Sequence, residues 1–445
     1  MNKTIVMLLA GGIGSRLYPL VQLRAKPAVP FGGVYRIIDF TLSNVMHSGF
    51  NDVAILTQYR PLSLMQHIGT GSPWGFLGRP GRATILPPRT GKQNSDWYRG
   101  TAVAIAQNLD YVMERDPERV LILSGDHIYS TDYRPLVEFH KEHSADVTIA
   151  VKKIPWEDTR HYGVVSVNSD LRIVSWQEKP QQAISNLASM GIYVFNAELL
   201  YKILKHDGMI DFGQDVIPGI IPKADVYAYP FDDYWADVGT LLSYWNANMD
   251  ILRKDSGIDL ESWDIRTNYE EDSKSGHRPP AYIGAKAVIS NSIVSPGCRV
   301  EGEVYHSILS PGVCVEKNAK ISESVIMHDT VIGAGSCLHK VISDKSVAIG
   351  ERCDIGVGVA KPLNKRYPGR VHTGLTVIAK GVRIPFGSVI EQNAVIHKSI
   401  KLYNMPVKRV LQDGFEESKH SYDLEDETQK DIARQHIPVN SSEVS

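Results

Sequence analysis

Two sequence patterns predict an α/β domain with a mainly parallel sheet at residues 1–253, followed by a parallel β-helix at residues 281–412. The first part alternates short apolar, β-branched runs with amphipathic stretches, which is typical of strand–helix–strand units. The second part repeats β-branched residues in short steps, with glycine and proline inside the pattern. Residues 254–280 between them are polar and end in two prolines, so we interpret them as a linker.

The strands of the α/β domain are predicted from runs that are apolar at nearly every position, as in strands buried on both faces. These runs are residues 5–9, 53–57, 120–123 and 147–151. Residues 102–113 and 133–143 have the periodicity of amphipathic helices, and residues 164–176 alternate as a half-buried strand does. Ligands of such sheets bind beyond the carboxyl ends of the strands, so the residues after each run are the candidates for function.

The β-helix is predicted from two nested repeats. Ile332 and Leu338 are six residues apart, as are Ile349 and Ile355. A longer repeat begins at residues 292, 307 and 324, in steps of 15 to 17 residues, which is close to three short steps. One step cannot bury its apolar residue alone, but stacked coils can, and this is the physical basis of a solenoid.

Composition excludes several classes of protein. The 445 residues carry 48 basic and 50 acidic side chains, so there is no basic excess for binding nucleic acid. No apolar run approaches the roughly 20 residues of a membrane span. The four cysteines, at 298, 314, 337 and 353, form no C-x-x-C pair, which argues against a zinc site or a disulfide framework and for the cytoplasm. Residues 413–445 are a polar tail that we expect to be mobile or to dock on a partner subunit.

A glycine-rich turn follows the first predicted strand. Gly11, Gly12 and Gly14 would let backbone N–H groups approach a polyphosphate, and Arg16 adds a fixed positive charge. The turn is neither a Walker P-loop nor the dinucleotide fingerprint. The alternative is an ordinary strand-to-helix turn. We favour phosphate binding because basic residues, including Lys26, follow closely.

Two acidic residues on separate segments are candidates for holding a metal ion. Asp126 follows the strand at residues 120–123, and Asp237 lies between aromatic residues and Gly239. Two such carboxylates suit Mg²⁺, which takes oxygen ligands and bridges protein to nucleotide phosphates. For Asp126 the competing interpretation is a helix cap.

Glu178 and Lys179 close the alternating stretch, and Lys179 would be a point charge for a sugar phosphate while Glu178 accepts hydrogen bonds from sugar hydroxyls. A solvated charge pair before a turn proline is the alternative.

The long glycine-rich stretch at residues 70–100 ends in 96–101, where aromatic residues next to arginine suggest contact with a base or sugar. Simple packing of Trp97 and Tyr98 competes with that interpretation.

Together, these segments resemble the ADP-glucose pyrophosphorylases (glucose-1-phosphate adenylyltransferases) of the sugar nucleotidyltransferase superfamily. The similarity runs from about residue 4 to about residue 358 and fades in the idiosyncratic stretch at 361–370. Its main motifs are residues 9–17, 24–29, 31–33, 35–40, 42–44, 97–102, 125–129, 178–180, 187–195, 211–213 and 234–240. It implies a Rossmann-like nucleotidyltransferase domain and a left-handed β-helix. It also implies a homotetramer, with a hetero-oligomer as the alternative.

The resemblance implies that the phosphate of glucose 1-phosphate attacks the α-phosphorus of ATP, giving ADP-glucose for glycogen synthesis and releasing pyrophosphate. The implied catalytic residues are Arg16, Lys26, Asp126, Lys179 and Asp237, with Mg²⁺ held by the two aspartates. Gly11, Gly12, Gly14 and Arg16 would bind ATP, while Tyr98, Gly163, Glu178, Lys179 and Ser189 would bind glucose 1-phosphate. Arg24 and Arg36 match positions near which many members bind allosteric regulators.

Departures from the family pattern keep other hypotheses open. Val103 stands where the family commonly has an aspartate, which suggests a catalytically weak regulatory subunit as one alternative. A transferase for another nucleotide is a second, because a glycine-rich turn contacts only phosphates. Acyl transfer in the β-helix is a third, which we disfavour because His306, His328 and His339 are isolated in the sequence.

Overall fold

The computed structural model describes residues 4–76, 82–89, 97–205, 208–269, 278–358, 364 and 367–397, together with the backbone of 410–411. The predicted tail at 413–445 lies outside these residues. Met1–Gly414 forms one compact unit, which contains both the α/β region and the β-helix. Of the helices described, none is both long enough and apolar enough to cross a membrane.

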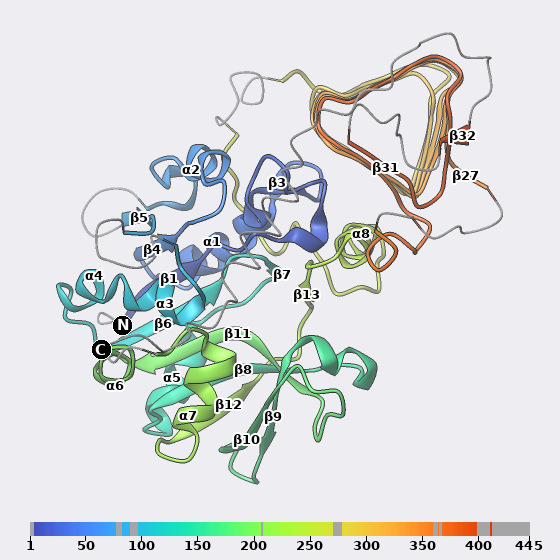
Figure 1. The fold of residues 1–445 in the computed structure, drawn as a ribbon. Coiled ribbons are helices and arrows are strands. Elements are labelled where there is room, and N and C mark those ends of the chain that lie inside the picture. The colour runs from blue at the N-terminus through green and yellow to red at the C-terminus, as the bar shows by residue number, and fades with distance from the viewer. Residues whose placement is uncertain are drawn as a thin grey trace, which may run out of the picture. The chain divides into compact units, whose positions relative to one another are not determined.

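The α/β region is built on a nine-stranded sheet with helices on both faces (Figure 1). The strand order is β10-β9-β11-β6-β1-β4-β5, and β8 pairs with both β11 and β12. These strands are β1 (Thr4–Leu9), β4 (Asp52–Leu56), β5 (Arg82–Leu86), β6 (Arg119–Ser124), β8 (Val147–Lys153), β9 (Gly163–Val167), β10 (Ile173–Glu178), β11 (Leu187–Asn196) and β12 (Val226–Pro230). The helices are α1 (Ile37–His47), α2 (Leu62–Ile68), α3 (Thr101–Ala106), α4 (Leu109–Met113), α5 (Arg134–Glu142), α6 (Ala197–Leu204), α7 (Ile217–Ile220) and α8 (Leu241–Asp250).

The sheet confirms the predicted fold class and refines it. Strands β6, β1, β4 and β5 are parallel to their neighbours in that part of the sheet. Three of the four predicted apolar runs form β1, β4 and β6, and the fourth forms β8, which is parallel to β12 and antiparallel to β11. Strand β5 was not predicted. Strand β11 pairs antiparallel to β6, β8 and β9, so the sheet is mixed. The alternating stretch at 164–176 is not one strand but the antiparallel pair β9 and β10.

Strand β1 shows why the sheet is apolar on both faces. Ile5 and Met7 join the core beneath α3, α4, α6 and α7, whereas Val6 and Leu8 join the core beneath α1, α2 and α5. Successive side chains of a strand point to opposite faces, so a strand covered on both sides needs an unbroken apolar run.

The helix predicted at 102–113 is divided into α3 and α4. The side-chain amide of Asn108 donates hydrogen bonds to the carbonyl of Ala104 at 2.9 Å and to the hydroxyl of Tyr98 at 3.0 Å. Asparagine side chains compete with the backbone in this way, and the helix is interrupted here. The amphipathic pattern continues across the break, which is why the sequence predicted a single helix.

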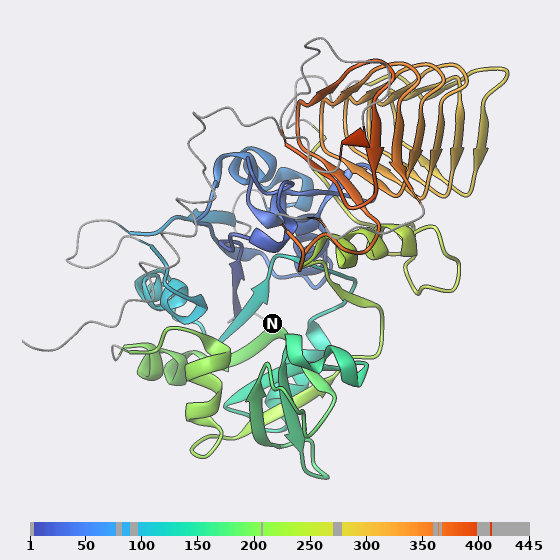
Figure 2. The same cartoon turned by 45° about the vertical axis from the view of Figure 1, so that its right-hand side comes forward.

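The β-helix consists of three parallel sheets whose coils form a triangular prism, seen along its axis in Figure 1 and from the side in Figure 2. The first sheet contains β14 (Tyr282–Ile283), β17 (Arg299–Val300), β20 (Cys314–Val315), β23 (Val331–Ile332), β26 (Ala348–Ile349) and β29 (Arg383–Ile384). The second contains β15 (Val288–Ser290), β18 (Glu303–Tyr305), β21 (Lys320–Ser322), β24 (Cys337–His339), β27 (Asp354–Val357), β30 (Val389–Glu391) and β32 (Val410–Leu411). The third contains β16 (Ile293–Val294), β19 (Ile308–Leu309), β22 (Val325–Ile326), β25 (Val341–Ser343), β28 (Thr376–Ile378) and β31 (Val395–Ile396).

The interior of the prism is a stack of aligned β-branched side chains. In the first sheet Val300, Val315, Ile332 and Ile349 are paired in register and buried. Each coil turns at corners where the backbone has a positive φ, for example at Lys340. The repeat therefore encodes one buried apolar residue per face and per coil, as the sequence predicted.

Candidate active site

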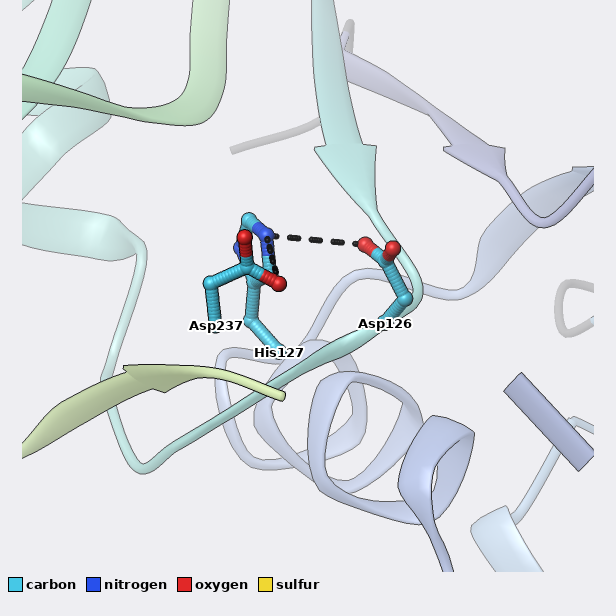
Figure 3. Close-up of side chains that lie close together, drawn as sticks. All are labelled: Asp126, His127 and Asp237. Carbon is cyan, nitrogen blue, oxygen red and sulfur yellow. Dashed lines mark ion pairs between the residues drawn. The ribbon is translucent and has the colours of Figure 1, made fainter. Parts of the chain in front are cut away.

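The two predicted metal-binding aspartates lie side by side beyond the carboxyl end of β6. Asp126 follows β6 directly, and β7 (His127–Tyr129) begins at the next residue. Strand β13 (Trp235–Asp237) pairs antiparallel with β7, which places Asp237 opposite His127 (Figure 3). Two segments more than a hundred residues apart therefore bring both carboxylates to one place.

Lys26 joins the two carboxylates. Its Nζ lies 2.8 Å from Oδ2 of Asp126 and 3.0 Å from Oδ1 of Asp237. The other oxygen of Asp126 accepts a hydrogen bond from the hydroxyl of Ser124. Lys26 is 5% exposed, whereas the side chains of Asp126 and Asp237 are 28% and 18% exposed.

The protonation states of the cluster follow from burial and from charge. Burial alone would raise the pKa of the Asp126 carboxyl, but Lys26 and His127 outweigh it and hold that pKa below its usual value. Burial would also raise the pKa of the Asp237 carboxyl, but the charges of Lys26 and His127 outweigh it and lower that pKa. Burial would lower the pKa of Lys26, but the two aspartates outweigh it and raise it. Both carboxylates are therefore ionised and Lys26 is charged at neutral pH.

The donor atoms of Asp126, His127 and Asp237 fit a divalent cation. They lie within 4.8 Å of one another. Nε2 of His127 is 3.5 Å from Asp126 and 3.9 Å from Asp237. Two ionised carboxylates supply the hard oxygen ligands that suit Mg²⁺.

The glycine-rich turn approaches this cluster closely. Gly14 has φ 65°, and a Cβ at this position would lie 2.8 Å from Cβ of Lys26. A Cβ at Gly239 would lie 2.8 Å from Nη2 of Arg16 and 3.0 Å from Oδ1 of Asp237. Both glycines are therefore needed for close packing, and Arg16 lies beside Asp237.

A cavity of about 200 Å³ lies next to the cluster, with Ser124 and His127 in its wall. Four of the residues predicted to bind glucose 1-phosphate also line it: Gly163, Glu178, Lys179 and Ser189. The wall of the cavity therefore includes residues just before and just after Asp126, which brings the predicted sugar site next to the predicted metal site.

Glu178 and Lys179 form an ion pair of 3.1 Å in this cavity. Lys179 has φ 45°, an uncommon backbone conformation for a residue with a side chain, and such strain concentrates at functional sites. A Cβ at Gly163 would lie 3.0 Å from Oε2 of Glu178, and one at Gly213 would lie 2.5 Å from it. Gly213 therefore makes room for this carboxylate, whereas a Cβ at Gly163 would lie even closer to the ring of Trp176.

Ser189 lies at an irregularity of β11, whose pairing with β8 shifts register between Ser189 and Tyr193. Its hydroxyl accepts a hydrogen bond from the N–H of Gly191 at 3.3 Å. Bulges of this kind occur next to active sites, where they redirect side chains.

Tyr98 does not line the cavity, in contrast to the other predicted sugar-binding residues. It is 7% exposed, and its hydroxyl donates to the carbonyl of Leu86 and accepts from Asn108. The structure gives it the packing role that was the alternative interpretation, whereas its neighbour Trp97 is exposed. Asp96, at the start of the predicted contact segment, lies outside the described residues.

Val103 lies in α3, whose start rests on residues 210–212. The N–H of Val103 donates to the carbonyl of Ile210 at 3.3 Å. The hydroxyl of Thr101 donates to Asp211 at 2.9 Å. Thr101, the first residue of α3, lines the cavity, but Val103 does not. The start of the helix therefore has no acidic side chain at position 103, where the family commonly has an aspartate.

The two arginines predicted to bind a regulator lie apart from the cavity. Arg24 is 3% exposed, and its Nη1 donates to Asp344 and to the carbonyl of Leu20. Arg36 donates to the carbonyl of Ala28 at 2.6 Å. It lines a second cavity of about 50 Å³, together with His67, Arg278, His328 and Lys345.

The three histidines considered for acyl transfer have separate surroundings. His306 contacts Asn291, and His339 contacts Ser322. His328 lines the second cavity, where burial and then the charge of Lys345 hold its pKa well below its usual value. These contacts do not bring the three side chains into one catalytic group.

Several residues of the cavity had no predicted role: His127, Tyr162, Trp176, Asp211, Phe212 and Gly213. His127 and residues 211–213 lie inside motifs of the resemblance, but the sequence does not indicate which groups they contact. Their contribution depends on packing against Glu178 and Asp126, which only the fold reveals.

Comparison with protein families gives two matches. Residues 5–254 match a model described as nucleotidyl transferase. Residues 280–378 match one described as GlmU-like, C-terminal hexapeptide.

Curated relatives match over nearly their whole length. A glucose-1-phosphate adenylyltransferase of Desulforamulus reducens is 44% identical over 88% of this chain and 97% of its own. The glucose-1-phosphate adenylyltransferase of Thermomicrobium roseum is 47% identical over 91% of this chain and 96% of its own. That of Acetivibrio thermocellus is 40% identical over 93% of this chain and 99% of its own.

Proposed function

Because the chain belongs to the nucleotidyl transferase family and, within it, to the glucose-1-phosphate adenylyltransferases, we propose that it transfers the adenylyl group of ATP to glucose 1-phosphate, giving ADP-glucose and pyrophosphate for glycogen synthesis. The observation that carries this proposal is the meeting of Asp126 and Asp237 on Lys26, next to a cavity lined by Lys179.

The reaction needs alignment and charge neutralisation more than covalent catalysis. An oxygen of the sugar phosphate forms a bond to the α-phosphorus of ATP, and the bond between that phosphorus and the bridging oxygen of the β-phosphate breaks. The nucleophile is already anionic, so no base is required to generate it. What the protein must supply is positive charge around the phosphates and a fixed approach of the two substrates.

Each group has a place in that task. Gly11, Gly12 and Gly14 present backbone N–H groups to the triphosphate, and Arg16 neutralises part of its charge. Lys26 moves from the carboxylates to the leaving pyrophosphate. On the other substrate, Lys179 contacts the phosphate of the sugar ester. Glu178, Gly163 and Ser189 are placed in the cavity to shape the glucose site.

Asp126 and Asp237 would hold Mg²⁺, with His127 beside them. When bound, the ion offsets negative charge on the phosphates and helps to orient them. The carboxyl groups of Asp126 and Asp237 are ionised, so they can bind the ion once Lys26 has moved away from them.

A coupled assay of pyrophosphate release from ATP and glucose 1-phosphate, with Mg²⁺, tests the proposal. We expect turnover of the order of 1–10³ per second by the chain alone, as for ordinary enzymes. Asp126→Asn should lower kcat by at least about a hundredfold, since it removes one anionic ligand. Asp170→Asn, on an exposed turn, is the matched control. Absence of pyrophosphate release at high enzyme concentration would contradict the proposal.

The same assay separates the remaining hypotheses. A panel of ATP, GTP, UTP and CTP distinguishes an adenylyltransferase from a transferase for another nucleotide, because the glycine-rich turn contacts phosphates only. A regulatory subunit would be nearly inactive alone and would change the rate of an active partner. Ordinary turnover by the isolated chain excludes that alternative despite Val103.

Further properties belong to the same proposal. We infer a homotetramer and a cytoplasmic location. We also infer allosteric regulation involving Arg24 and Arg36. The basic lining of the second cavity, which includes Arg36, supports this regulation. The division of the chain into residues 1–253, 254–280, 281–412 and 413–445 belongs to the same proposal, and the family matches at 5–254 and 280–378 support its first two boundaries. Sedimentation and a panel of phosphorylated metabolites would test assembly and regulation.

A further inference from the structure

A segment between β27 and β28 leaves the regular coils of the β-helix. Its described residues are 358, 364 and 367–375, and it includes the part of the sequence that departs from the family pattern. The segment is fixed at its base. The side-chain amide of Asn364 donates to the carbonyl of Asn393 at 2.9 Å, and its oxygen accepts from the N–H of Tyr367 at 2.8 Å.

The tip of this segment contacts the glycine-rich turn. Nη1 of Arg370 donates a hydrogen bond to the carbonyl of Ser15 at 3.2 Å. The rings of Tyr367 and Tyr18 lie 5.8 Å apart between centroids. Val371 is 2% exposed and belongs to the same apolar cluster as Leu17. Apolar packing therefore supports the polar contact.

The hydrogen bond from Arg370 acts on the peptide that leads into Arg16. In a planar trans peptide the C=O and the following N–H point in opposite directions. Holding the carbonyl of Ser15 therefore fixes the direction of the Arg16 N–H and the start of the Arg16 side chain. Within the turn, the N–H of Tyr18 also donates to the carbonyl of Ser15 at 3.2 Å. Arg370 therefore adds a second hydrogen bond to this carbonyl, from outside the turn.

We propose that Arg370 is a positioning residue for the nucleotide, acting through the Ser15 carbonyl to hold the glycine-rich turn and Arg16 in place for the triphosphate. The inference rests on the proposed function, since it assumes that this turn binds ATP. It adds a residue from the β-helix, which contacts no substrate itself, to the adenylyl-transfer machinery.

The variants are Arg370→Met, which keeps the aliphatic stem but removes the donor, and Arg370→Lys, which keeps a donor. We expect the Kd for ATP with Mg²⁺, measured by equilibrium titration without the sugar phosphate, to rise about tenfold in Arg370→Met, as for loss of one charge-assisted hydrogen bond. The KM for glucose 1-phosphate should stay within twofold of the wild type. Arg370→Lys should recover most of the ATP affinity.

Arg299→Met is the matched control, because Arg299 is an exposed β-helix arginine that pairs with Glu301. It should leave both substrates unaffected. Thermal unfolding of each variant identifies any general loss of structure. An unchanged Kd for ATP in Arg370→Met, or equal weakening of both substrates with a lowered Tm, would overturn the inference. Failure of the wild type to release pyrophosphate would instead reject the proposed function.

Discussion

Arg24 and Asp344 form a buried ion pair although 320 residues separate them in the chain. The Nη1 to Oδ1 distance is 2.9 Å, and each side chain is 3% exposed. The pair joins the α/β region to the β-helix two residues before Lys26, the residue on which the two aspartates meet. An arginine of this kind has a structural role that its sequence context does not reveal.

Asp344→Ala should destabilise the protein strongly, because it leaves the Arg24 guanidinium buried without its counter-charge. Breaking one side of a buried pair costs about 3–5 kcal/mol. Equilibrium denaturation in urea measures the change. Glu198→Ala removes the exposed partner of Lys202 and should have no measurable effect. Similar unfolding midpoints for both variants would contradict the role assigned to the buried pair.

Lys26→Met should strengthen metal binding while it weakens catalysis. The Lys26 ammonium shares both carboxylates that would hold the ion, so its removal lets a dication bind without competition. We expect the Kd for Mn²⁺, measured by electron paramagnetic resonance without nucleotide, to fall about tenfold while kcat falls at least about a hundredfold. Lys205→Met, on the surface beyond α6, is the control. Weaker Mn²⁺ binding in Lys26→Met would be the opposite of the expected result.

Lys179→Met should affect one substrate only. Lys179 lines the cavity beside Glu178, so it can offset the charge of the sugar phosphate. The KM for glucose 1-phosphate should rise about 10- to 100-fold, with the KM for ATP within twofold. Steady-state kinetics with each substrate varied gives both values, and Lys202→Met is the exposed control. If the KM for ATP rose instead, Lys179 would belong to the nucleotide site.

Gly213→Ala should disturb the sugar site without unfolding the protein. The new Cβ would lie 2.5 Å from Oε2 of Glu178, so that carboxylate must move away from its position in the cavity. We expect the KM for glucose 1-phosphate to rise about tenfold. Gly219→Ala is a matched control in α7, because no atom lies within 4 Å of a Cβ there. Equal kinetics for the two variants would show that Glu178 does not contact the sugar.

His140 should make stability depend on pH in weakly acidic solution. Burial lowers the pKa of this histidine from its ordinary value of 6.5 to about 4. Between these values the unfolded chain binds a proton that the folded protein does not, so stability falls as the pH falls from about 6.5 to about 4. The loss could reach about 3 kcal/mol by the lower limit.

His140→Gln tests this dependence, because an amide can still bond to Thr148 and Asn196 but does not titrate. Urea denaturation across this pH range should show a shallower slope for the variant than for the wild type. The charges that bear on His140 are Arg119, which lowers its pKa, and Asp146, which raises it. His161→Gln, at an exposed position, should keep the wild-type slope.

The sequence predicted the fold well where burial leaves a clear pattern. The run at residues 5–9 is apolar because β1 is covered on both faces, and the repeated β-branched residues are the stacked interior of the prism. The break between α3 and α4 was not predicted, because it accompanies hydrogen bonds from the Asn108 side chain to Ala104 and Tyr98 that the amphipathic pattern does not show. Antiparallel β11 was missed for a similar reason, since strand direction leaves no mark on hydrophobicity.

The site shows the same division. Charged residues in a recognisable motif, such as Asp126 and Lys179, could be chosen from the sequence, and the structure places Asp126 beside Asp237 and Lys179 in a cavity wall. Gly213 was not, because its role is to leave space for Glu178, which lies elsewhere in the chain. Arg24 was predicted to lie near a regulator site, and the sequence did not reveal that its side chain pairs with Asp344.

The prism has one more consequence, for how the molecule should fail under heat. Every coil bonds only to the one before and the one after it, so melting can start at an open end and advance turn by turn. Asp344 directly follows β25, the fourth of six strands in its sheet. Loss of the outermost turns would thus leave the ion pair between Asp344 and Arg24 intact, and activity should outlast the first loss of β structure on warming.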